Sequence, residues 1–258
     1  MCGIIAPADP LGRLQCIEEG EGTALTGEGK APRVLVVDDE REIADLVTLY
    51  LKNEGCRVYT CCDGAEALRW IQTEELDLAI LDVMLPGVNG FELCRRIRES
   101  HTYPVIMLTA RVEDMDKING LTIGADDYIT KPFNPLELVA RAKAQLRRYL
   151  RYGAPPDREE DFLEFSGLTI NRATHGCTLY GKAVNLTPIE FDILWCLAEN
   201  RGRVVSQEAL FERVWGEKYL DSNNTVMVHI RRLREKLKEP PRNPKIIKTV
   251  WGVGYKIE

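Results

Sequence analysis

Acidic side chains follow two apolar runs in the N-terminal half of the chain. Asp38 and Asp39 come directly after Val34–Val37, and Asp82 follows Leu78–Leu81. Carboxylates that are brought together repel one another unless a cation lies among them, and such an oxygen-rich site suits Mg²⁺. A single aspartate after a strand is usually a helix N-cap, and this alternative stays open for Asp39 taken alone.

A hydroxyl and an ammonium group occupy the same kind of position after two later runs. Thr109 follows Val105–Leu108, and Lys131 follows Asp127–Thr130. An attacking carboxylate, a metal ion, a hydroxyl and a lysine form a set that can bind and transfer a phosphoryl group. A lone Lys-Pro step is usually only a loop, but so many such residues at consecutive strand ends rarely arise by chance.

Such a site requires that these runs be parallel strands of one sheet. Apolar runs alternate with helical patterns from residue 34 to residue 150, which is typical of strands joined by crossover helices. We therefore predict a doubly wound α/β domain whose ligands bind at the carboxyl edge of a five-stranded parallel sheet. The predicted strands are 34–37, 58–61, 78–81, 105–108 and 127–130, and the predicted helices are 40–53, 64–74, 90–99, 113–123 and 135–150.

Four segments of this half resemble the flavodoxin-like receiver domain of bacterial response regulators. They are VVDDE at 36–40, LDVMLPGVNGFELCRRIR at 81–98, VIMLTA at 105–110 and GADDYITKPF at 124–133. The resemblance implies that Asp82 is the phosphoacceptor for a sensor histidine kinase. It also implies that Mg²⁺ binds Asp38, Asp39, Asp82 and the Met84 carbonyl, that Thr109 and Lys131 bind phosphoryl oxygens, that Tyr128 is an aromatic switch, and that Lys131–Pro132 is cis.

The same resemblance implies a phosphorylation-dependent homodimer. Its two-fold interface would be formed by the 113–124 helix, the fifth strand and the 134–150 helix. The alternative is that the charged residues on these elements pair within one chain and contribute little. The implied pairs across the interface are Lys117 with Glu137, Asp127 with Arg141, and Asp126 with Arg148.

The C-terminal part of the chain is basic, although the whole protein is acidic. The net charge is −6, yet residues 201–258 carry 13 Lys and Arg against 7 Asp and Glu. This division of charge favours a nucleic-acid-binding segment. Here we predict short strands near 162–165, 168–172, 177–180 and 183–186, helices at 187–200, 206–215 and 223–238, and a terminal hairpin within 246–257.

The last of these helices has an apolar and a basic face. Apolar residues recur at helical spacing from Val226 to Leu237 and would seat the helix on a core. A solvated surface is one interpretation of the opposite face. The preceding short helix, the turn at 216–222 and the terminal hairpin favour a helix-turn-helix variant followed by a wing. The opposite face carries Asn224, Val228, Arg231, Arg232 and Glu235.

NNTVMVHIRRLREKL at 223–237 and IKTVWGVGYKIE at 247–258 resemble the α+β winged-helix domain of OmpR/PhoB-type regulators. The resemblance implies binding to promoter DNA and to RNA polymerase, and within the family the chain is most similar to VanR-type regulators of glycopeptide-resistance operons. Trp251 stands where many relatives have a wing arginine, and Asn224 replaces a frequent arginine. The implied DNA contacts are Met227, Val228 and Arg232 near base edges, Asn224, His229 and Arg231 near phosphates, and Thr249 and Trp251 in the wing.

Together these patterns predict a leader at 1–32, a receiver at 33–150, a linker at 151–160 and a DNA-binding domain at 161–258. The leader is rich in Gly and Glu and is predicted to be disordered. No apolar stretch approaches the ~20 residues of a spanning helix, and no signal peptide is evident, so we expect a cytoplasmic protein without membrane contact. Eight cysteines without a C-x-x-C spacing predict free thiols and no zinc site.

Two other functions are each favoured by one feature of the sequence. Met1-Cys2-Gly3-Ile4 resembles the start of class II glutamine amidotransferases, whose terminal cysteine is the nucleophile. Such an enzyme needs a large sandwich domain, whereas the receiver pattern begins soon after the leader, so we predict no enzyme. Alternatively, the basic domain binds a protein partner, and salt-dependent DNA binding would separate this case from a DNA-binding function.

Overall fold

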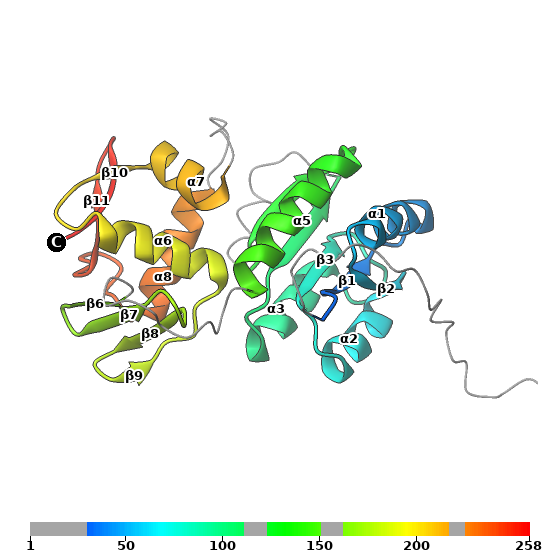
Figure 1. Cartoon of the computed structure of the whole chain (residues 1–258), viewed down its shortest axis with the longest axis horizontal. Coiled ribbons are helices and arrows are strands. Elements are labelled where there is room, and N and C mark those ends of the chain that lie inside the picture. The colour runs from blue at the N-terminus through cyan, green and yellow to red at the C-terminus, as the bar shows by residue number, and fades with distance from the viewer. Residues whose placement is uncertain (1–29, 111–122, 151–161, 217–224) are drawn as a thin grey trace, which may run out of the picture.

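The computed structural model describes residues 30–110, 123–150, 162–216 and 225–258 (Figure 1). Three predicted segments lie wholly or mostly outside the described residues: residues 1–29 of the leader, residues 113–122 of the predicted 113–123 helix, and the linker. The described residues form an N-terminal α/β domain and a C-terminal α+β domain, and helix α5 of the first lies beside α6 of the second. No helix among these residues is both long and apolar enough to cross a membrane.

The N-terminal domain contains the parallel sheet predicted from the sequence. The five strands are in the order β2-β1-β3-β4-β5, and every neighbouring pair is parallel. The order reverses at β1 and β3, whose carboxyl ends therefore flank the crevice where such folds bind ligands. The strands are β1 (Arg33–Val37), β2 (Arg57–Cys61), β3 (Leu78–Asp82), β4 (Val105–Thr109) and β5 (Asp127–Thr130).

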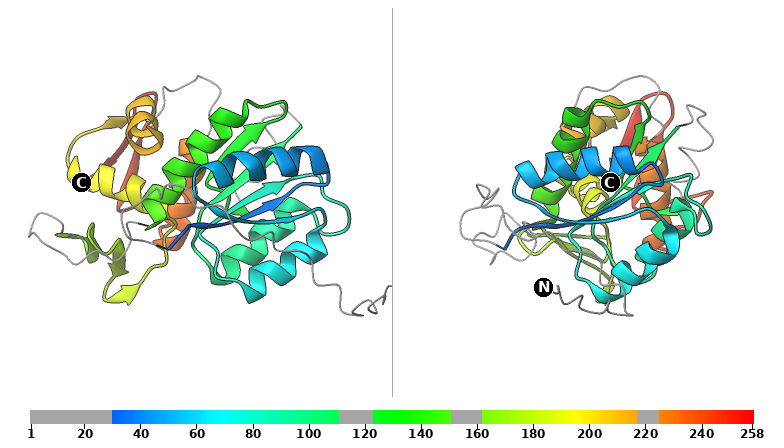
Figure 2. Two further views of the ribbon diagram at one scale, coloured as in Figure 1. Left: turned by 45° about the vertical axis from the view of Figure 1, so that its right-hand side comes forward. Right: turned by 90° about the vertical axis from the view of Figure 1, so that its right-hand side faces the viewer.

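Helices cover both faces of this sheet (Figure 2). In β1, Val34 and Val36 pack in the core on the α1 and α5 face, whereas Leu35 and Val37 pack in the core on the α2 and α3 face. This alternation explains why the strands read as continuous apolar runs, since both faces are buried. The helices are α1 (Arg41–Asn53), α2 (Gly64–Thr73), α3 (Gly90–Ser100) and α5 (Pro135–Leu150).

The start of α3 lies directly against the end of β3. A Cβ atom on Gly90 would lie 2.0 Å from the Asp82 carbonyl oxygen, so a larger residue would push the helix away from the strand. The helix is capped by Asn89, whose Oδ1 accepts a hydrogen bond from the Glu92 amide at 2.9 Å. This close approach holds the backbone of Asp82 in place at the sheet edge.

The C-terminal domain packs three helices against two small antiparallel sheets around one core. The first sheet contains β6 (Phe162–Phe165), β7 (Leu168–Asn171), β8 (Gly176–Leu179) and β9 (Lys182–Ala183). The second, in the order β10-β12-β11, contains β10 (Val205–Ser206), β11 (Ile247–Val250) and β12 (Gly254–Ile257). The helices are α6 (Pro188–Glu199), α7 (Gln207–Trp215) and α8 (Thr225–Lys236).

The sequence-based element boundaries agree with most of this structure and differ at two strands. The strand predicted at 183–186 is the two-residue β9. The strand β10 was not predicted, because two residues are too few to show an alternating pattern, and it is defined by pairing with β12. The terminal hairpin is confirmed, and its turn lies at residues 251–253.

Candidate functional site

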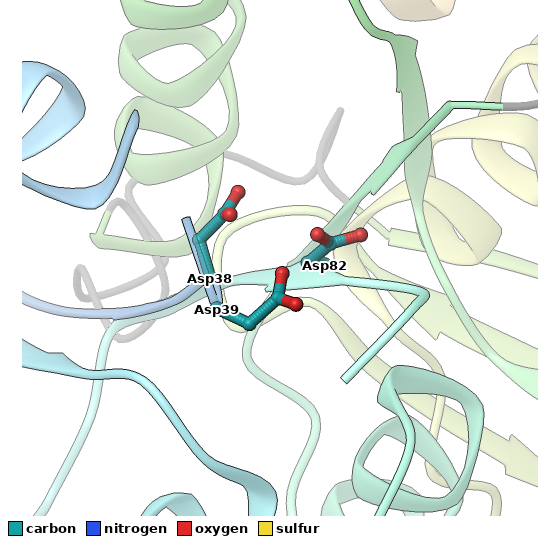
Figure 3. A group of neighbouring side chains, drawn as sticks. All are labelled: Asp38, Asp39 and Asp82. Atoms are coloured by element: carbon teal, nitrogen blue, oxygen red, sulfur yellow. The ribbon is translucent and has the colours of Figure 1, made fainter. Parts of the chain in front are cut away.

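The acidic side chains predicted to converge do lie together at the carboxyl edge of the sheet (Figure 3). Asp38 and Asp39 follow β1, and Asp82 is the last residue of the neighbouring strand β3. Carboxylate oxygens of all three residues lie within 4.8 Å of one another. Asp38 and Asp82 are buried and Asp39 is exposed, so the cluster is anchored in the protein and open to solvent on one side.

Lys131 brings a positive charge into this cluster from the end of β5. Its Nζ lies 2.8 Å from Asp38 Oδ2, 2.8 Å from Asp82 Oδ2 and 3.2 Å from Glu40 Oε1. The Lys131–Pro132 bond is cis, as predicted. Burial raises the pKa of Asp38, and the Lys131 ammonium opposes that rise. Burial would lower the pKa of Lys131, but the hydrogen bonds and charges of the two aspartates raise it.

The cluster has the chemistry that a divalent cation requires. Three carboxylates face one ammonium group, so negative charge remains to be balanced. All of the side-chain ligands are oxygen atoms, and the open side at Asp39 leaves room for the water molecules that Mg²⁺ retains. Met84 follows β3, and its amide donates to Asp82 Oδ1 at 3.1 Å. These residues therefore fit the predicted Mg²⁺.

Thr109 lies on β4, the strand beside β3, and Tyr128 lies on β5, the edge strand beside β4. Thr109 is the buried last residue of β4, and its carbonyl accepts a hydrogen bond from the Lys131 amide at 2.7 Å. Tyr128 is half-buried in β5, and it packs against the core on the α2 and α3 face. Both residues thus lie on the strands that lead to the acidic cluster.

The charged residues of the predicted dimer interface pair within this single chain. Arg141 Nη1 lies 3.1 Å from Asp127 Oδ2, and Arg141 Nη2 lies 3.0 Å from Glu137 Oε1. Burial raises the pKa of Asp127, and the Arg141 charge opposes that rise. Asp126 is fully buried and pairs with Arg98 at 2.6 Å. Lys117 lies outside the described residues.

Arg148 joins the two domains. Its Nε lies 3.3 Å from Asp192 Oδ2 on α6, and its guanidinium also donates to the Val214 carbonyl on α7. Burial raises the pKa of Asp192 to about 6, although the Arg148 and Arg172 charges lower it. In this arrangement Arg148 is therefore occupied by the C-terminal domain.

Helix α8 presents a different face to solvent from the one predicted. Met227 is 47% exposed and Arg231 is exposed, as expected, whereas Arg232 is only 6% exposed and Val228 and His229 are buried. Arg232 Nη1 donates to the Ala125 carbonyl of the N-terminal domain at 3.4 Å. The prediction of an exposed face is thus wrong for Val228 and Arg232, and His229, which the resemblance implied as a phosphate contact, is buried as well. For Arg232 the physical reason is that the other domain covers it.

His229 lies at the same contact. The backbone of Asp126 lies beside its imidazole, and the Trp215 ring centroid is 5.6 Å away. Burial, followed by the Arg232 charge, lowers the pKa of His229 to about 3. The imidazole is therefore neutral at physiological pH, so a charge-assisted phosphate contact by this residue requires that the domains separate. Asn224 lies outside the described residues.

Of the two predicted DNA contacts in the wing, Thr249 is hydrogen-bonded within the domain and Trp251 is exposed to solvent. Thr249 Oγ1 accepts a hydrogen bond from Arg234 Nη2 at 2.8 Å. Trp251 is 90% exposed at the tip between β11 and β12. Large aromatic side chains are seldom so exposed without a partner, so the wing tip is a surface available for binding.

The acidic residues that bind these arginines and lysines were not predicted from the sequence. Glu40 contacts Lys131, and Glu190 of α6 contacts both Arg232 and Lys236 of α8. The T-P-I-E pattern at 187–190 is a capping box and could have indicated Glu190 as a helix-starting residue. Its contact with α8 depends on how the helices pack, which that pattern does not specify.

Comparisons with known proteins agree with this architecture. Residues 34–143 match the family "Response regulator receiver domain", and residues 181–257 match "Transcriptional regulatory protein, C terminal". The chain is 62% identical over 229 residues to Regulatory protein VanRc of Enterococcus gallinarum, covering 88% of this chain and 98% of that protein. It is 59% identical over 227 residues to Regulatory protein VanR of Enterococcus faecium, with the same coverage of 88% and 98%.

More distant proteins share the whole two-domain plan. DNA-binding response regulator MtrA of Mycobacterium tuberculosis strain H37Rv is 42% identical over 224 residues, covering 87% of this chain and 96% of that protein. The solved structure of a RitR mutant is 27% identical with a TM-score of 0.67, covering 88% of this chain and 99% of that one. Both domains predicted from the sequence are therefore found together in related proteins.

Proposed function

The chain belongs to the two-component response regulators that join a receiver domain to an OmpR/PhoB-type DNA-binding domain, and we propose that phosphorylation of Asp82 controls its DNA binding. A DNA-binding transcription regulator of this kind receives its signal from a sensor histidine kinase. The observation that carries the proposal is the cluster of Asp38, Asp39 and Asp82 around Lys131 at the carboxyl edge of the receiver sheet.

The two oxygens of Asp82 are held by different groups. Oδ1 accepts a hydrogen bond from the Met84 amide at 3.1 Å, and Oδ2 lies 2.8 Å from Lys131 Nζ. In the proposed reaction, one of these oxygens attacks the phosphorus of a phosphohistidine, and the phosphorus–nitrogen bond breaks as the histidine leaves. Lys131 then moves its hydrogen bond from the carboxylate to a phosphoryl oxygen, and the Thr109 hydroxyl binds another.

Asp38, Asp39, Asp82 and the Met84 carbonyl are the groups that would hold Mg²⁺. When bound, the ion would neutralise charge on the phosphoryl oxygens during transfer. Asp38 is placed for this role by its burial and by its contact with Lys131, which orients the carboxylate toward Asp82. Because Asp39 is exposed, it can contribute an oxygen without first losing an internal partner.

We propose that DNA is read by α8 and that the receiver must move away first. Arg232 is bound to Ala125 of the receiver, and His229 is buried beside Asp126. The proposed dimer pair of Asp126 with Arg148 is blocked in the same arrangement, because Arg98 and Asp192 already bind these residues. Separation of the domains would therefore free the DNA-reading face and release Arg148 from Asp192. The Arg98–Asp126 pair lies within the receiver, so it would have to break separately before Asp126 could join the dimer interface.

The biological setting follows from the relatives. Identity of 62% to VanRc supports a VanR-like role, which we propose to be control of a cell-envelope or glycopeptide-resistance operon together with RNA polymerase. We propose a cytoplasmic location, which the proposed DNA target and kinase partner support. We assign it no enzymatic turnover, since its phosphoryl chemistry modifies the protein itself.

Phosphate incorporation into the full-length chain tests the assignment of Asp82. We expect wild-type protein to take up phosphate from a cognate-type histidine kinase or from acetyl phosphate, to need Mg²⁺, and to lose the label in hydroxylamine as an acyl phosphate does. Asp82→Asn should take up none, whereas Asp45→Asn, an exposed control on α1, should behave as wild type. Uptake by Asp82→Asn at the wild-type rate would show that the assignment is wrong.

DNA titration at two salt concentrations tests the proposed reading helix. Arg232→Ala should reduce the preference for an operator over scrambled DNA, because a bidentate arginine–guanine contact is worth ~1–3 kcal/mol. Arg231→Ala should weaken binding to both DNAs alike and flatten the salt dependence, as loss of a phosphate contact does. An Arg232→Ala variant that keeps the full preference would show that Arg232 does not read bases.

A further inference from the structure

Glu190 is a fully buried carboxylate that contacts two cationic side chains of the DNA-reading helix. Its Oε1 lies 3.2 Å from Arg232 Nη2, and its Oε2 lies 2.5 Å from Lys236 Nζ. Glu190 itself belongs to α6, which packs on α8 in the DNA-binding domain. A buried acid of one helix therefore holds the basic side chains of another.

The capping role of Glu190 does not require its charge. Glu190 Oε2 accepts a hydrogen bond from the Thr187 amide at 2.8 Å, which closes the capping box of α6. A glutamine can close such a box equally well, because its amide oxygen is also an acceptor. Burial of a carboxylate is costly unless the charge is paired. Arg232 and Lys236 pair with the Glu190 charge and stabilise it. They lower the pKa of Glu190, whereas burial raises it.

The contact with Glu190 leaves the other edge of Arg232 pointing out of its own domain. Nη2 is directed toward Glu190, whereas Nη1 donates to the Ala125 carbonyl of the receiver at 3.4 Å. A carbonyl oxygen is the same kind of acceptor as O6 of guanine. The contact between Nη2 and Glu190 Oε1 is an ion pair, and the N–H donors of Nη1 are separate from it. When the receiver moves away, Arg232 Nη1 loses the Ala125 carbonyl and can donate to another acceptor that takes its place.

We propose that Glu190 is a positioning residue for base reading, which holds the guanidinium of Arg232 so that its Nη1 edge meets a base acceptor. This inference rests on the proposed function of Arg232. Without the carboxylate, the long arginine side chain regains rotational freedom and must be ordered again each time it binds DNA. The variant would then lose discrimination between sequences, while the phosphate contacts of Arg231 and the rest of the domain would be kept.

A purely structural role for Glu190 makes a different prediction. If Glu190 served only to cap α6 and fill the core, its replacement would lower stability and would weaken binding to operator and scrambled DNA in the same proportion. The ratio of the two affinities would not move. The ratio, and not either affinity alone, therefore distinguishes positioning from structure.

The experiment is a double-mutant cycle in the full-length, phosphorylated chain. The probe is a duplex selected by the wild-type protein from a random-sequence pool, measured against a scrambled duplex of the same composition. The proteins are wild type, Glu190→Gln, Arg232→Ala and the double variant, with Glu199→Gln as an exposed control on the same helix. Glu190→Asp, which keeps the charge but shortens the side chain, replaces Glu190→Gln if thermal melting shows that the latter does not fold.

We expect Glu190→Gln to lower the operator preference several-fold in the wild-type background and to leave it unchanged in the Arg232→Ala background. The Glu199→Gln variant should match wild type. An unchanged preference in folded Glu190→Gln, or an equal loss in both backgrounds, would overturn the inference and leave base reading by Arg232 intact. A full operator preference in Arg232→Ala would instead overturn the proposed function, and the inference with it.

Discussion

Replacing Lys131 with methionine removes the cation from the acidic cluster and keeps a side chain of similar length. Lys131 Nζ is 2.8 Å from both Asp38 Oδ2 and Asp82 Oδ2, and all three side chains are nearly or fully buried. Removal of one partner from a buried ion pair typically costs about 3–5 kcal/mol, because the remaining charge is left without compensation. The contact with Glu40 adds little, since that side chain is largely exposed.

We therefore expect Lys131→Met to lower the free energy of opening of the receiver sheet by about 3–5 kcal/mol in EDTA. Added Mg²⁺ should recover much of this loss. A ligand at 100 times its dissociation constant stabilises by about 2.7 kcal/mol, and the variant should bind Mg²⁺ roughly tenfold more tightly than wild type, because the ammonium group no longer repels the ion. Mg²⁺ should thus stabilise the variant more than wild type.

Hydrogen exchange measured by mass spectrometry on peptides from β1 and β3 reports this free energy for the receiver alone. This choice avoids treating a two-domain protein as a single unfolding unit. Lys52→Met is the matched control, since Lys52 is exposed on α1. Exchange of Lys131→Met at the wild-type rate in EDTA, or equal protection of the two proteins by Mg²⁺, would contradict a stabilising role for the Lys131 charge.

Three further predictions concern the contacts between domains and between chains. Arg148→Ala removes an ion pair and a charged hydrogen bond to the DNA-binding domain, worth together about 2 kcal/mol, so the unphosphorylated variant should bind operator DNA at least several-fold more tightly. Arg147→Ala, at an exposed position of α5, is the control. An Arg148→Ala variant that binds the operator no more tightly than wild type and the control would contradict a restraining role for Arg148. The pKa of His229 is about 3 in the packed arrangement and about 6.5 when free, so packing is fully stable above pH 6.5. It should weaken by about 1.4 kcal/mol per pH unit below 6.5, which small-angle X-ray scattering would detect as expansion at pH 5.5 that is absent in His229→Gln. Finally, single charge reversals at Asp127 and Arg141 should block the phosphorylated dimer, and the double reversal should restore it. If the phosphorylated single variants sediment as dimers, as the wild type is expected to, then Asp127 and Arg141 pair only within one chain.

The acidic site could be predicted from the sequence because its geometry follows from topology. Asp38, Asp82 and Lys131 each follow or end a strand of a parallel sheet, and such strands bring their carboxyl ends to one edge. No knowledge of side-chain packing is needed for this step. The contact of Glu40 with Lys131 was not predicted, because Glu40 lies beyond the end of β1. Topology does not fix the direction of a side chain there.

The DNA-reading face was predicted less well, for an equally physical reason. Helical periodicity identifies the face of α8 that is buried in its own domain, and Val226, Ile230 and Leu233 do lie in that core. It gives no information about a second domain that covers the opposite side. Arg232 and His229 are polar and therefore looked exposed, whereas docking against the receiver buries both.

Control of DNA binding by Asp82 is tested most directly by the affinity of the full-length protein for its selected operator. This affinity is measured with and without a phosphodonor, in wild type and in Asp82→Asn. We predict that phosphorylation tightens operator binding by wild-type protein and leaves Asp82→Asn at the unphosphorylated affinity. Equal tightening of both proteins, or no response of a demonstrably phosphorylated wild type, would contradict the claim that Asp82 controls DNA binding.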